Sequence, residues 1–300
     1  MMTPTTHSYT VGVEKFTEQF REKFEGSVTD LESLFTMLST DKGTVQQYGI
    51  SGLGKPLSAG VMGEVHFQDM HQMGKVTFTM GTSTLGFMVP DQLDDDSQYV
   101  NFWSEGGQSM GQGFKFWKEY LMNLVLDRAT NSSYTMYDGW CLSSASRTTL
   151  EGTAVSNLIS TMTLNYQNMW VAAMYFEYGQ LDQKDLPYKG TPATLLIHPR
   201  KLPDALKALG GDVEPDTLAR NVQSLKSRYN INLKVNRLQT TTTNWALLGE
   251  GAKKDFIYYT RHEPRITKKE TTTYHAKLVR GIYRAAAGAR SGLNFLLIGS

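Results

Sequence analysis

The sequence predicts an α+β fold, in which helices and strands are segregated along the chain. Three observations indicate this: a long amphipathic helix over 110–128, an alternating strand pattern within 75–90, and strand patterns over much of 231–300. Regular βαβ winding would instead place a helix between successive strands. With 300 residues, 40% of them hydrophobic, the chain can bury a substantial core as one large or two intertwined domains.

A first amphipathic helix is predicted over 13–24, followed by a second helical piece over 28–38. The apolar residues of the first helix recur at helical spacing, namely Val13, Phe16, Phe20 and Phe24. Gly26 is expected to end this helix. The helix could dock on the core of its own chain or act as an arm on a neighbouring subunit, and periodicity alone favours the first.

The next part of the chain combines a glycine-rich stretch with two predicted strands. Residues 43–63 hold six glycines and a proline without any period, which indicates a loop or an extended arm. Strands are predicted at 64–70 and 75–90, joined by a turn at 71–74, and an acidic run follows at 91–96. An isolated hairpin of this length is marginal in water, so we expect a partner to cover it.

The remaining elements follow from periodicity and turn residues. The helix over 110–128 places Met110, Phe114, Trp117, Leu121 and Leu124 on one apolar stripe. A turn is predicted at 137–140, a weakly periodic helix within 154–178, a buried strand at 193–198, a helix from 204, and strands at 231–238, 244–249 and 255–262. The segment 273–288 is ambiguous between strand and helix.

Charge is distributed unevenly although the formal net charge is only +1. Residues 1–150 hold 10 Lys and Arg against 17 Asp and Glu, and residues 251–300 hold 10 against 3. The first half is therefore net −7 and the last segment net +7, which excludes a bulk polybasic nucleic-acid binder. The single cysteine, Cys141, excludes an internal disulfide framework. The first 20 residues lack a secretory signal pattern, and no apolar stretch is long enough to span a membrane.

Catalytic and metal motifs are weak or absent in the sequence. Residues 49–56 have the spacing of a phosphate loop, but Pro56 stands where that loop needs Ser or Thr, so a glycine hinge is the better interpretation. Asp94–Asp96 would begin a calcium loop that has Tyr99 in place of its glycine. The six histidines form no metal-binding pair, and a lone histidine such as His198 is more often structural. We therefore expect no catalytic residue, metal or cofactor.

Basic and aromatic residues are interleaved in the last 50 residues. Tyr258, Tyr259, Tyr274 and Tyr283 lie among ten lysines and arginines, a combination that can bind single-stranded nucleic acid. The alternatives are a solvated strand face or a docking surface for the acidic half of another copy. The opposing charges favour the docking surface, because head-to-tail contacts between identical subunits need two different surfaces.

The succession of several segments resembles a known family. KVTFTMGTSTLGFMVPDQLDDDSQY leads into the long helix and then YDGWCLSS, and further on stand GTPATLLIHPRKLPDALKAL, WALLG, IYYTRHEPRIT and LVRGIYRAAAG. In this order and spacing, over about residues 10–290, they resemble the major capsid proteins of tailed bacteriophages, most closely the Mu-like major head subunit family. The succession carries the resemblance, because no single segment is as specific as a metal-ligand motif.

The resemblance implies the Hong Kong 97-type phage capsid fold. Its expected parts are an N-terminal arm over 1–57, an extended loop hairpin over 58–95, a peripheral domain over 96–134 and 244–300 with a spine helix at about 106–130, and an axial domain over 135–243. The extended loop would lie across a neighbouring subunit, which supplies the partner that the predicted hairpin requires. This also favours an arm role for the N-terminal segment.

The resemblance also implies a function. The chain would be the major capsid protein of a tailed double-stranded DNA bacteriophage, a structural protein that self-assembles through pentamers and hexamers around the genome. Expected partners are other copies of itself, scaffold, portal and decoration proteins, and packaged DNA held non-specifically, with no membrane. The expected location is the virion, after assembly in the host cytoplasm. An encapsulin-type nanocompartment shell protein is the alternative, and a nucleic-acid-binding module using residues 251–300 is a more distant one.

Candidate contacts with neighbouring subunits follow from these patterns. They are Phe16, Phe20, Lys75, Asp94, Asp95, Asp96, Arg261, Arg265, Lys268 and Lys269. Some relatives cross-link a lysine of the extended loop to an asparagine of the peripheral domain; Lys75 is the only lysine of the predicted hairpin, and Asn294 is the only asparagine in the final 50 residues. No motif marks either residue as reactive, so we expect no cross-link and expect Lys75 to serve as a salt-bridge donor.

Overall fold

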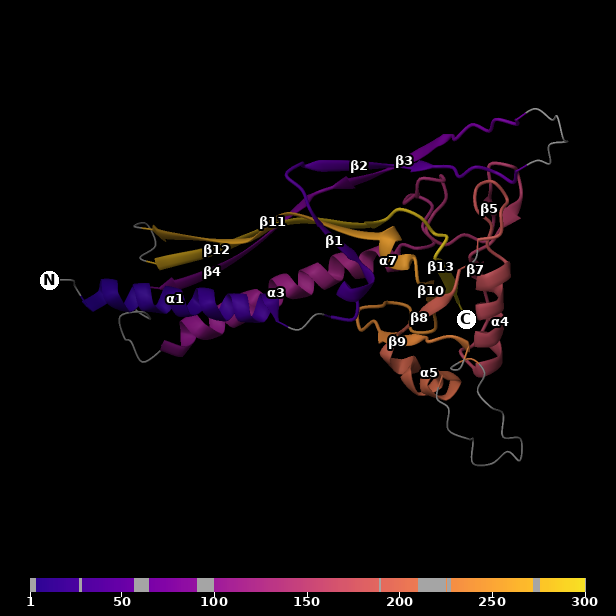
Figure 1. Cartoon of the computed structure of the whole chain (residues 1–300). Coiled ribbons are helices and arrows are strands. Elements are labelled where there is room, and N and C mark those ends of the chain that lie inside the picture. Colours follow the sequence, from indigo (N-terminus) through magenta and orange to yellow (C-terminus); the bar gives the residue numbers. More distant parts are fainter. Residues whose placement is uncertain are drawn as a thin grey trace, which may run out of the picture.

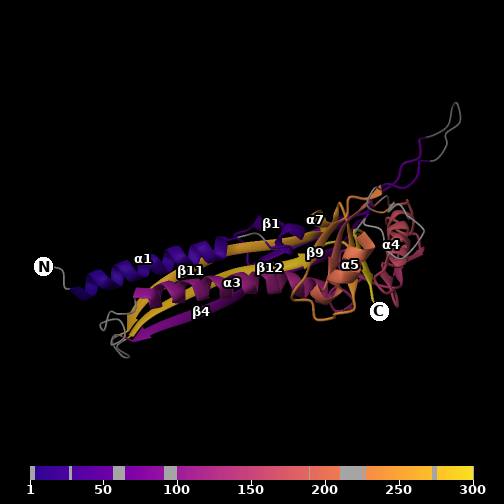
Figure 2. The same cartoon turned by 90° about the horizontal axis from the view of Figure 1, so that it is seen from below.

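The computed structural model describes residues 4–26, 29–56, 65–90, 100–188, 190–209, 225, 228–271 and 276–299. The molecule is elongated, with two long helices and a four-stranded sheet running side by side away from a compact part that contains a five-stranded sheet (Figures 1 and 2). The N-terminus lies at the free end of the elongated part and the C-terminus lies in the compact part (Figure 1). The predicted α+β class is confirmed.

The helices and strands have the following bounds. The helices are α1 (Pro4–Glu25), α3 (Val100–Asp127), α4 (Tyr166–Tyr178), α5 (Leu202–Leu209) and α7 (Ala252–Asp255), with 3₁₀ turns at Glu32–Leu34 and Pro199–Lys201. The strands are β1 (Thr36–Ser39), β2 (Thr44–Ile50), β3 (Gln72–Thr79), β4 (Gly81–Pro90), β5 (Arg147–Thr148), β6 (Ala154–Val155), β7 (Leu158–Ile159), β8 (Pro192–Ile197), β9 (Asn232–Val235), β10 (Trp245–Gly249), β11 (Phe256–Thr271), β12 (Ala276–Ala289) and β13 (Phe295–Ile298).

The four-stranded sheet has the order β1-β11-β12-β4. Strands β11 and β12 form its long antiparallel centre, so the ambiguous segment 273–288 is a strand. One face of the sheet packs on α1 and α3, where Tyr258 and Tyr283 join the main core. The register of β11 shifts twice between Thr260 and Arg265, which bends the strand at its middle.

Helix α3 confirms the predicted long helix, but its buried stripe differs from the predicted one. Met110 and Phe114 are buried, whereas Trp117 is 36% exposed and stacks on Tyr120. Two glycines explain the difference, because they let the backbone of α1 approach α3. A Cβ atom on Gly107 would lie 2.5 Å from the Phe16 carbonyl oxygen, and one on Gly111 would lie 2.7 Å from that of Phe20.

The second helical piece predicted over 28–38 is wrong. Within 29–38 only the 3₁₀ turn Glu32–Leu34 forms, and β1 then pairs in parallel with β11 at the edge of the sheet. The apolar residues of this segment do reach the core: Phe35 is buried and its ring lies 5.3 Å from that of Phe256. As a strand, the segment pairs its backbone N–H and C=O groups with the open edge of β11, and this pairing would be lost if the segment were helical.

The five-stranded sheet of the compact part has the order β7-β13-β10-β8-β9. It confirms the strands predicted at 193–198, 231–238 and 244–249. The helix predicted within 154–178 is confirmed only as α4, whose N-cap Asn165 accepts a hydrogen bond from the Asn168 N–H. Within the predicted segment 244–300, β11 and β12 join the four-stranded sheet, whereas β10 and β13 belong to this one.

The predicted pairing of 64–70 with 75–90 is wrong. Strand β2 pairs antiparallel with β3, while β4 leaves that hairpin and pairs with β12. The hairpin therefore starts inside the glycine-rich stretch that the sequence suggested to be a loop, earlier than the predicted limit at 58. The alternation over Val76, Phe78 and Met80 is confirmed, because all three are buried against the sheet face opposite α1 and α3.

Candidate subunit-contact surfaces

The far part of the β2–β3 hairpin exposes apolar side chains. Residues 51–56 and 65–71 continue beyond the paired strands as a protrusion past the compact part (Figures 1 and 2). The large apolar residues of this protrusion are exposed by 54% for Leu53, 72% for Val65, 92% for Phe67 and 58% for Met70, and Ile50 at the end of β2 is exposed by 64%. Such clustering of exposed apolar residues on a projecting segment is typical of an interaction site.

The near part of the hairpin is fixed to the sheet. The Phe78 ring lies 5.2 Å from the Tyr259 ring, and Gln47 Nε2 donates a hydrogen bond of 2.6 Å to the Tyr259 hydroxyl. Gly74 permits close approach to the Tyr137 backbone, because a Cβ atom there would lie 2.7 Å from the Tyr137 carbonyl oxygen. The base of the hairpin is thus fixed to the sheet, whereas the large apolar side chains beyond it stay exposed.

The contact candidates from α1 and β3 occupy different environments. Phe16 and Phe20 are 0% and 3% exposed and pack in the core of their own chain, so the single chain presents no surface of either ring to a neighbour. The described part of α1 thus docks on its own core, as its periodicity indicated. Lys75 is exposed on β3 and borders a groove of about 490 Å³ between β3, α3 and the end of β12.

The acidic candidates and the side chains of two basic candidates lie outside the described part of the chain. Asp94, Asp95 and Asp96 lie outside the described residues. Lys268 and Lys269 belong to β11, but their side chains lie outside the described part.

Arg261 and Arg265 are brought together with two residues that were not among the predicted contact residues, His262 and Arg284. His262 pairs with Arg284 across β11 and β12. The pKa of His262 is lowered by desolvation and then by the charges of Arg265, Arg261 and Arg284, while the charge of Asp41 acts in the opposite direction with a smaller effect. We call these four residues the arginine cluster. The charges of its three arginines oppose protonation of the His262 imidazole.

The tyrosines of the basic segment do not form a stacking surface for bases. Tyr258, Tyr259 and Tyr283 are 0%, 6% and 2% exposed, and Tyr274 lies outside the described residues. The hydroxyls of Tyr258 and Tyr283 lie 2.7 Å apart inside the core, and burial is the main cause that raises both pKa values. The hypothesis that these three rings stack on the bases of single-stranded nucleic acid is therefore wrong.

Residues 49–56, which have the spacing of a phosphate loop, are described by the structure and include no helical turn. Gly49 lies in β2, and residues 51–56 are irregular without a helical turn. Among the residues that the structure describes, no group of His, Cys, Asp or Glu could hold a metal ion. His198 is structural, since its Nδ1 accepts a hydrogen bond from the Arg200 N–H. In the described helices, no segment is both apolar and long enough to cross a membrane.

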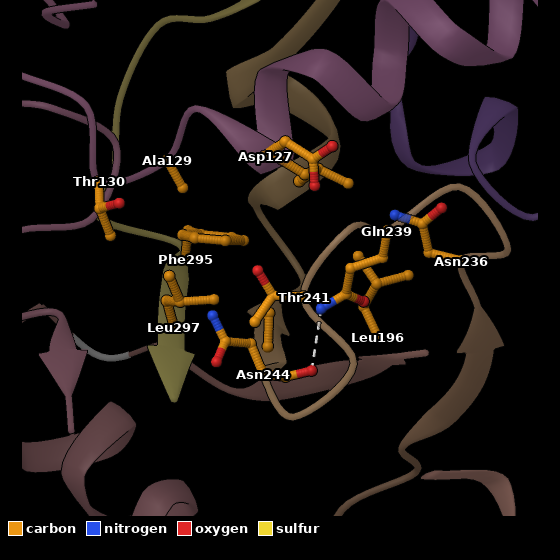
Figure 3. Close-up of a pocket in the computed structure, with 12 residues that line it drawn as sticks. Asp127, Ala129, Thr130, Leu196, Asn236, Gln239, Thr241, Asn244, Phe295 and Leu297 are labelled. Carbon is orange, nitrogen blue, oxygen red and sulfur yellow. Dashed lines mark hydrogen bonds between the residues drawn. The ribbon is translucent and has the colours of Figure 1, made fainter. Parts of the chain in front are cut away.

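A small cavity separates the end of α3 from the five-stranded sheet (Figure 3). Its volume is about 90 Å³, enough for a few water molecules and too small for a nucleotide cofactor. Gln239 Nε2 donates to the Asn244 carbonyl oxygen at its rim, as Figure 3 shows. Asn236 Nδ2 donates to Asn123 Oδ1 of α3, so the polar groups join the two parts of the molecule.

Asn294 belongs to a buried polar network. Its Nδ2 donates a 2.6 Å hydrogen bond to Asp255 Oδ2, and its Oδ1 accepts one of 2.8 Å from the Tyr188 hydroxyl. Arg290 Nη2 lies 3.6 Å from the other Asp255 oxygen. Asn294 is only 7% exposed and fully engaged, an environment unlike that of a residue open to a lysine from another chain.

The same network predicts a pH effect on stability. Burial raises the pKa of Asp255 above its ordinary 3.8, and the Asn294 and Arg290 contacts only partly offset this. The folded chain thus holds this proton more tightly than the unfolded chain, so the contribution to stability is complete below 3.8 and is lost as the pH rises through the raised pKa.

Asp255→Asn should therefore gain stability relative to the parent chain as the pH rises from acid to neutral, measured by denaturant unfolding at several pH values. Asp204→Asn controls for the loss of a half-exposed carboxylate. A stability difference between Asp255→Asn and the parent chain that does not change with pH would contradict this assignment.

Solved structures share this architecture over most of the chain. The capsid of a native GTA particle matches at 10% identity with a TM-score of 0.59, covering 91% of this chain and 91% of that chain. The procapsid of bacteriophage JBD30 matches at 14% identity with a TM-score of 0.51, covering 100% of this chain and 76% of that one. A virus-like particle from Pyrococcus furiosus matches at 9% identity with a TM-score of 0.53, covering 95% and 98%. No family model and no curated protein sequence matches.

These matches agree with the features already described. The long helix against a four-stranded sheet, the projecting hairpin and the compact five-stranded part occur in one chain and align together with capsid chains. At such low identities the likeness concerns the fold. The chain has the Hong Kong 97-type capsid fold.

Proposed function

We propose that the chain is a structural shell protein, which forms a closed container from many copies of itself and carries no catalytic centre. The observation that supports this best is the hairpin that projects from the body with its apolar residues exposed. Phe67 and Val65 are 92% and 72% exposed in the described part of the chain, and large apolar side chains clustered at such exposure are typical of an interaction surface. A neighbouring copy that covers them would bury this surface and stabilise the assembly.

The finer proposal is the major capsid protein of a tailed double-stranded DNA bacteriophage. Pentamers and hexamers would build the shell, with scaffold, portal and decoration proteins as further partners. The shell would assemble in the host cytoplasm and become part of the virion. Support comes from the fold shared with the bacteriophage JBD30 procapsid and from the family resemblance of the sequence.

An encapsulin-type compartment is the second candidate. The match to the virus-like particle from Pyrococcus furiosus covers 98% of that chain, so the fold is also compatible with an encapsulin-type shell. The two candidates differ in content: the phage shell would enclose DNA, whereas the compartment would enclose protein cargo.

Electron microscopy of the purified full chain tests the shared part of the proposal. We expect rings or closed shells, together with a sedimentation coefficient far above that of a 33.6 kDa monomer. A chain that stays monomeric at high concentration, with and without a co-expressed scaffold, would refute the proposal. Nuclease-protected DNA inside the particles favours the phage capsid, and enclosed protein favours the compartment.

A further inference from the structure

Arg284 of the arginine cluster lies on the face of the four-stranded sheet that α1 and α3 do not cover. Tyr283 packs in the core with α3, and successive residues of a strand point to opposite faces, so Arg284 points to the other face. Ala286, two residues further on that face, is covered by the near part of the hairpin. Arg284 therefore lies just beyond the area that the hairpin covers.

The cluster has unused hydrogen-bonding capacity. The Nε atoms of Arg261 and Arg284 are shielded from solvent and have no hydrogen-bond partner in the described part of the chain. No ion pair between described residues involves Arg261, Arg265 or Arg284. Shielded guanidinium donors without partners are costly, and several like charges at one place add repulsion. An anionic group with several oxygens would accept hydrogen bonds from these donors and would also offset the repulsion between the positive charges.

The chain itself holds a matching anionic segment. The first 150 residues carry the net charge of −7, and Asp91 and Asp94–Asp96 form their densest acidic run. This run follows Pro90, which pairs with Ala276, whereas Arg284 lies eight residues further along β12. At roughly 3.3 Å per residue, Pro90 lies about 27 Å along the sheet from Arg284 of its own chain. A second copy is therefore the better source of the carboxylates.

Nucleic acid is the less favoured occupant. The tyrosines that would stack on bases are buried, and the net charge of +1 provides little general attraction for phosphate. Carboxylates, in contrast, match the fork geometry of arginine and can accept two hydrogen bonds from one guanidinium group.

We propose that Arg261, Arg265 and Arg284 receive carboxylates of a second copy of the chain, with Asp94–Asp96 as their source. This rests on the proposed shell function, because it assigns one contact between neighbouring subunits. In this contact the carboxylates would pair with the guanidinium groups, which would offset the repulsion among the three arginines beside His262.

Assembly of the full-length chain tests the proposal in four variants. They are the double variant Arg261→Gln with Arg284→Gln, the triple variant Asp94→Asn with Asp95→Asn and Asp96→Asn, the combination of both, and the control Arg200→Gln, which removes an exposed arginine elsewhere. We expect the double and triple variants each to raise the concentration needed for assembly at least tenfold. The combination should be little worse than either, since both remove the same contact. The control should assemble as the parent chain does.

The outcomes separate this contact from the shell function itself. If the parent chain does not assemble, the proposed function fails. If the parent chain assembles and the arginine variant assembles equally well, only this contact is refuted. Full additivity of the two sets also refutes it, because the residues would then act in separate contacts. Reduced DNA content at unchanged assembly would assign the cluster to nucleic acid instead. Thermal unfolding of dissociated subunits confirms that each variant is folded.

Discussion

Replacing Ile50 and Phe67 by aspartate should abolish assembly of the chain without unfolding it. Ile50 ends β2 and Phe67 lies in the far part of the hairpin; their side chains are 64% and 92% exposed, so their loss costs the single chain little packing. Burying such a side chain contributes roughly 1.5–3 kcal/mol, and two of them would contribute roughly 3–6 kcal/mol per subunit contact. Aspartate would lose this and would add the cost of desolvating a charge.

The expected result is a monomer or small oligomer at concentrations where the parent chain forms particles, measured by sedimentation velocity and electron microscopy. Leu206→Asp is the matched control, because Leu206 is an exposed apolar residue too, at 53%, but lies on α5, away from the hairpin. Equal loss of assembly in the control would indicate a general effect of surface charge. Normal particles from the Ile50→Asp, Phe67→Asp variant would show that the hairpin is not a contact between subunits.

The hairpin shows what the sequence could and could not predict. The alternation of Val76, Phe78 and Met80 predicted β3, because one face of that strand is buried. Strand β2 has no such signal, since most of its residues remain exposed or half-buried and its apolar residues are few. Its position follows from pairing with β3, a long-range contact that local periodicity does not contain. The resemblance suggested an extended loop, but the bounds needed the pairing itself.

The contact residues were predictable only in part, for a similar reason. The charge asymmetry pointed to Arg261 and Arg265 as partners for an acidic segment. Arg284 and His262 join them because β11 and β12 pair in a particular register and β11 is bulged there. The aromatic residues near them suggested a stacking surface, yet strand alternation buries Tyr258 and Tyr283 in the core. Composition thus identified the charged residues, and the pairing register of β11 with β12 determines which of them lie together.

The glycines of α3 provide the second strong prediction, which concerns stability. Gly107→Ala should lower the free energy of unfolding although alanine is the better helix former by about 1 kcal/mol. Its Cβ atom would lie 2.5 Å from the Phe16 carbonyl oxygen and 3.1 Å from the Phe16 Cα atom, so the backbone of α1 would have to move. Such overpacking typically costs about 1–3 kcal/mol, and the movement would also loosen Phe16, which is fully buried.

A second glycine of the same helix is the matched control. At Gly113 a Cβ atom would meet only the Leu85 Cδ2 atom, at 3.1 Å, and this end of a flexible side chain can turn aside. Gly113→Ala should therefore leave the free energy of unfolding unchanged or raise it by up to about 1 kcal/mol, measured by denaturant titration. Hydrogen exchange should show faster opening of α1 in Gly107→Ala only. If both variants gain stability equally, the close approach of the α1 backbone to Gly107 does not limit stability. Helix propensity alone would then explain the effect of alanine in α3.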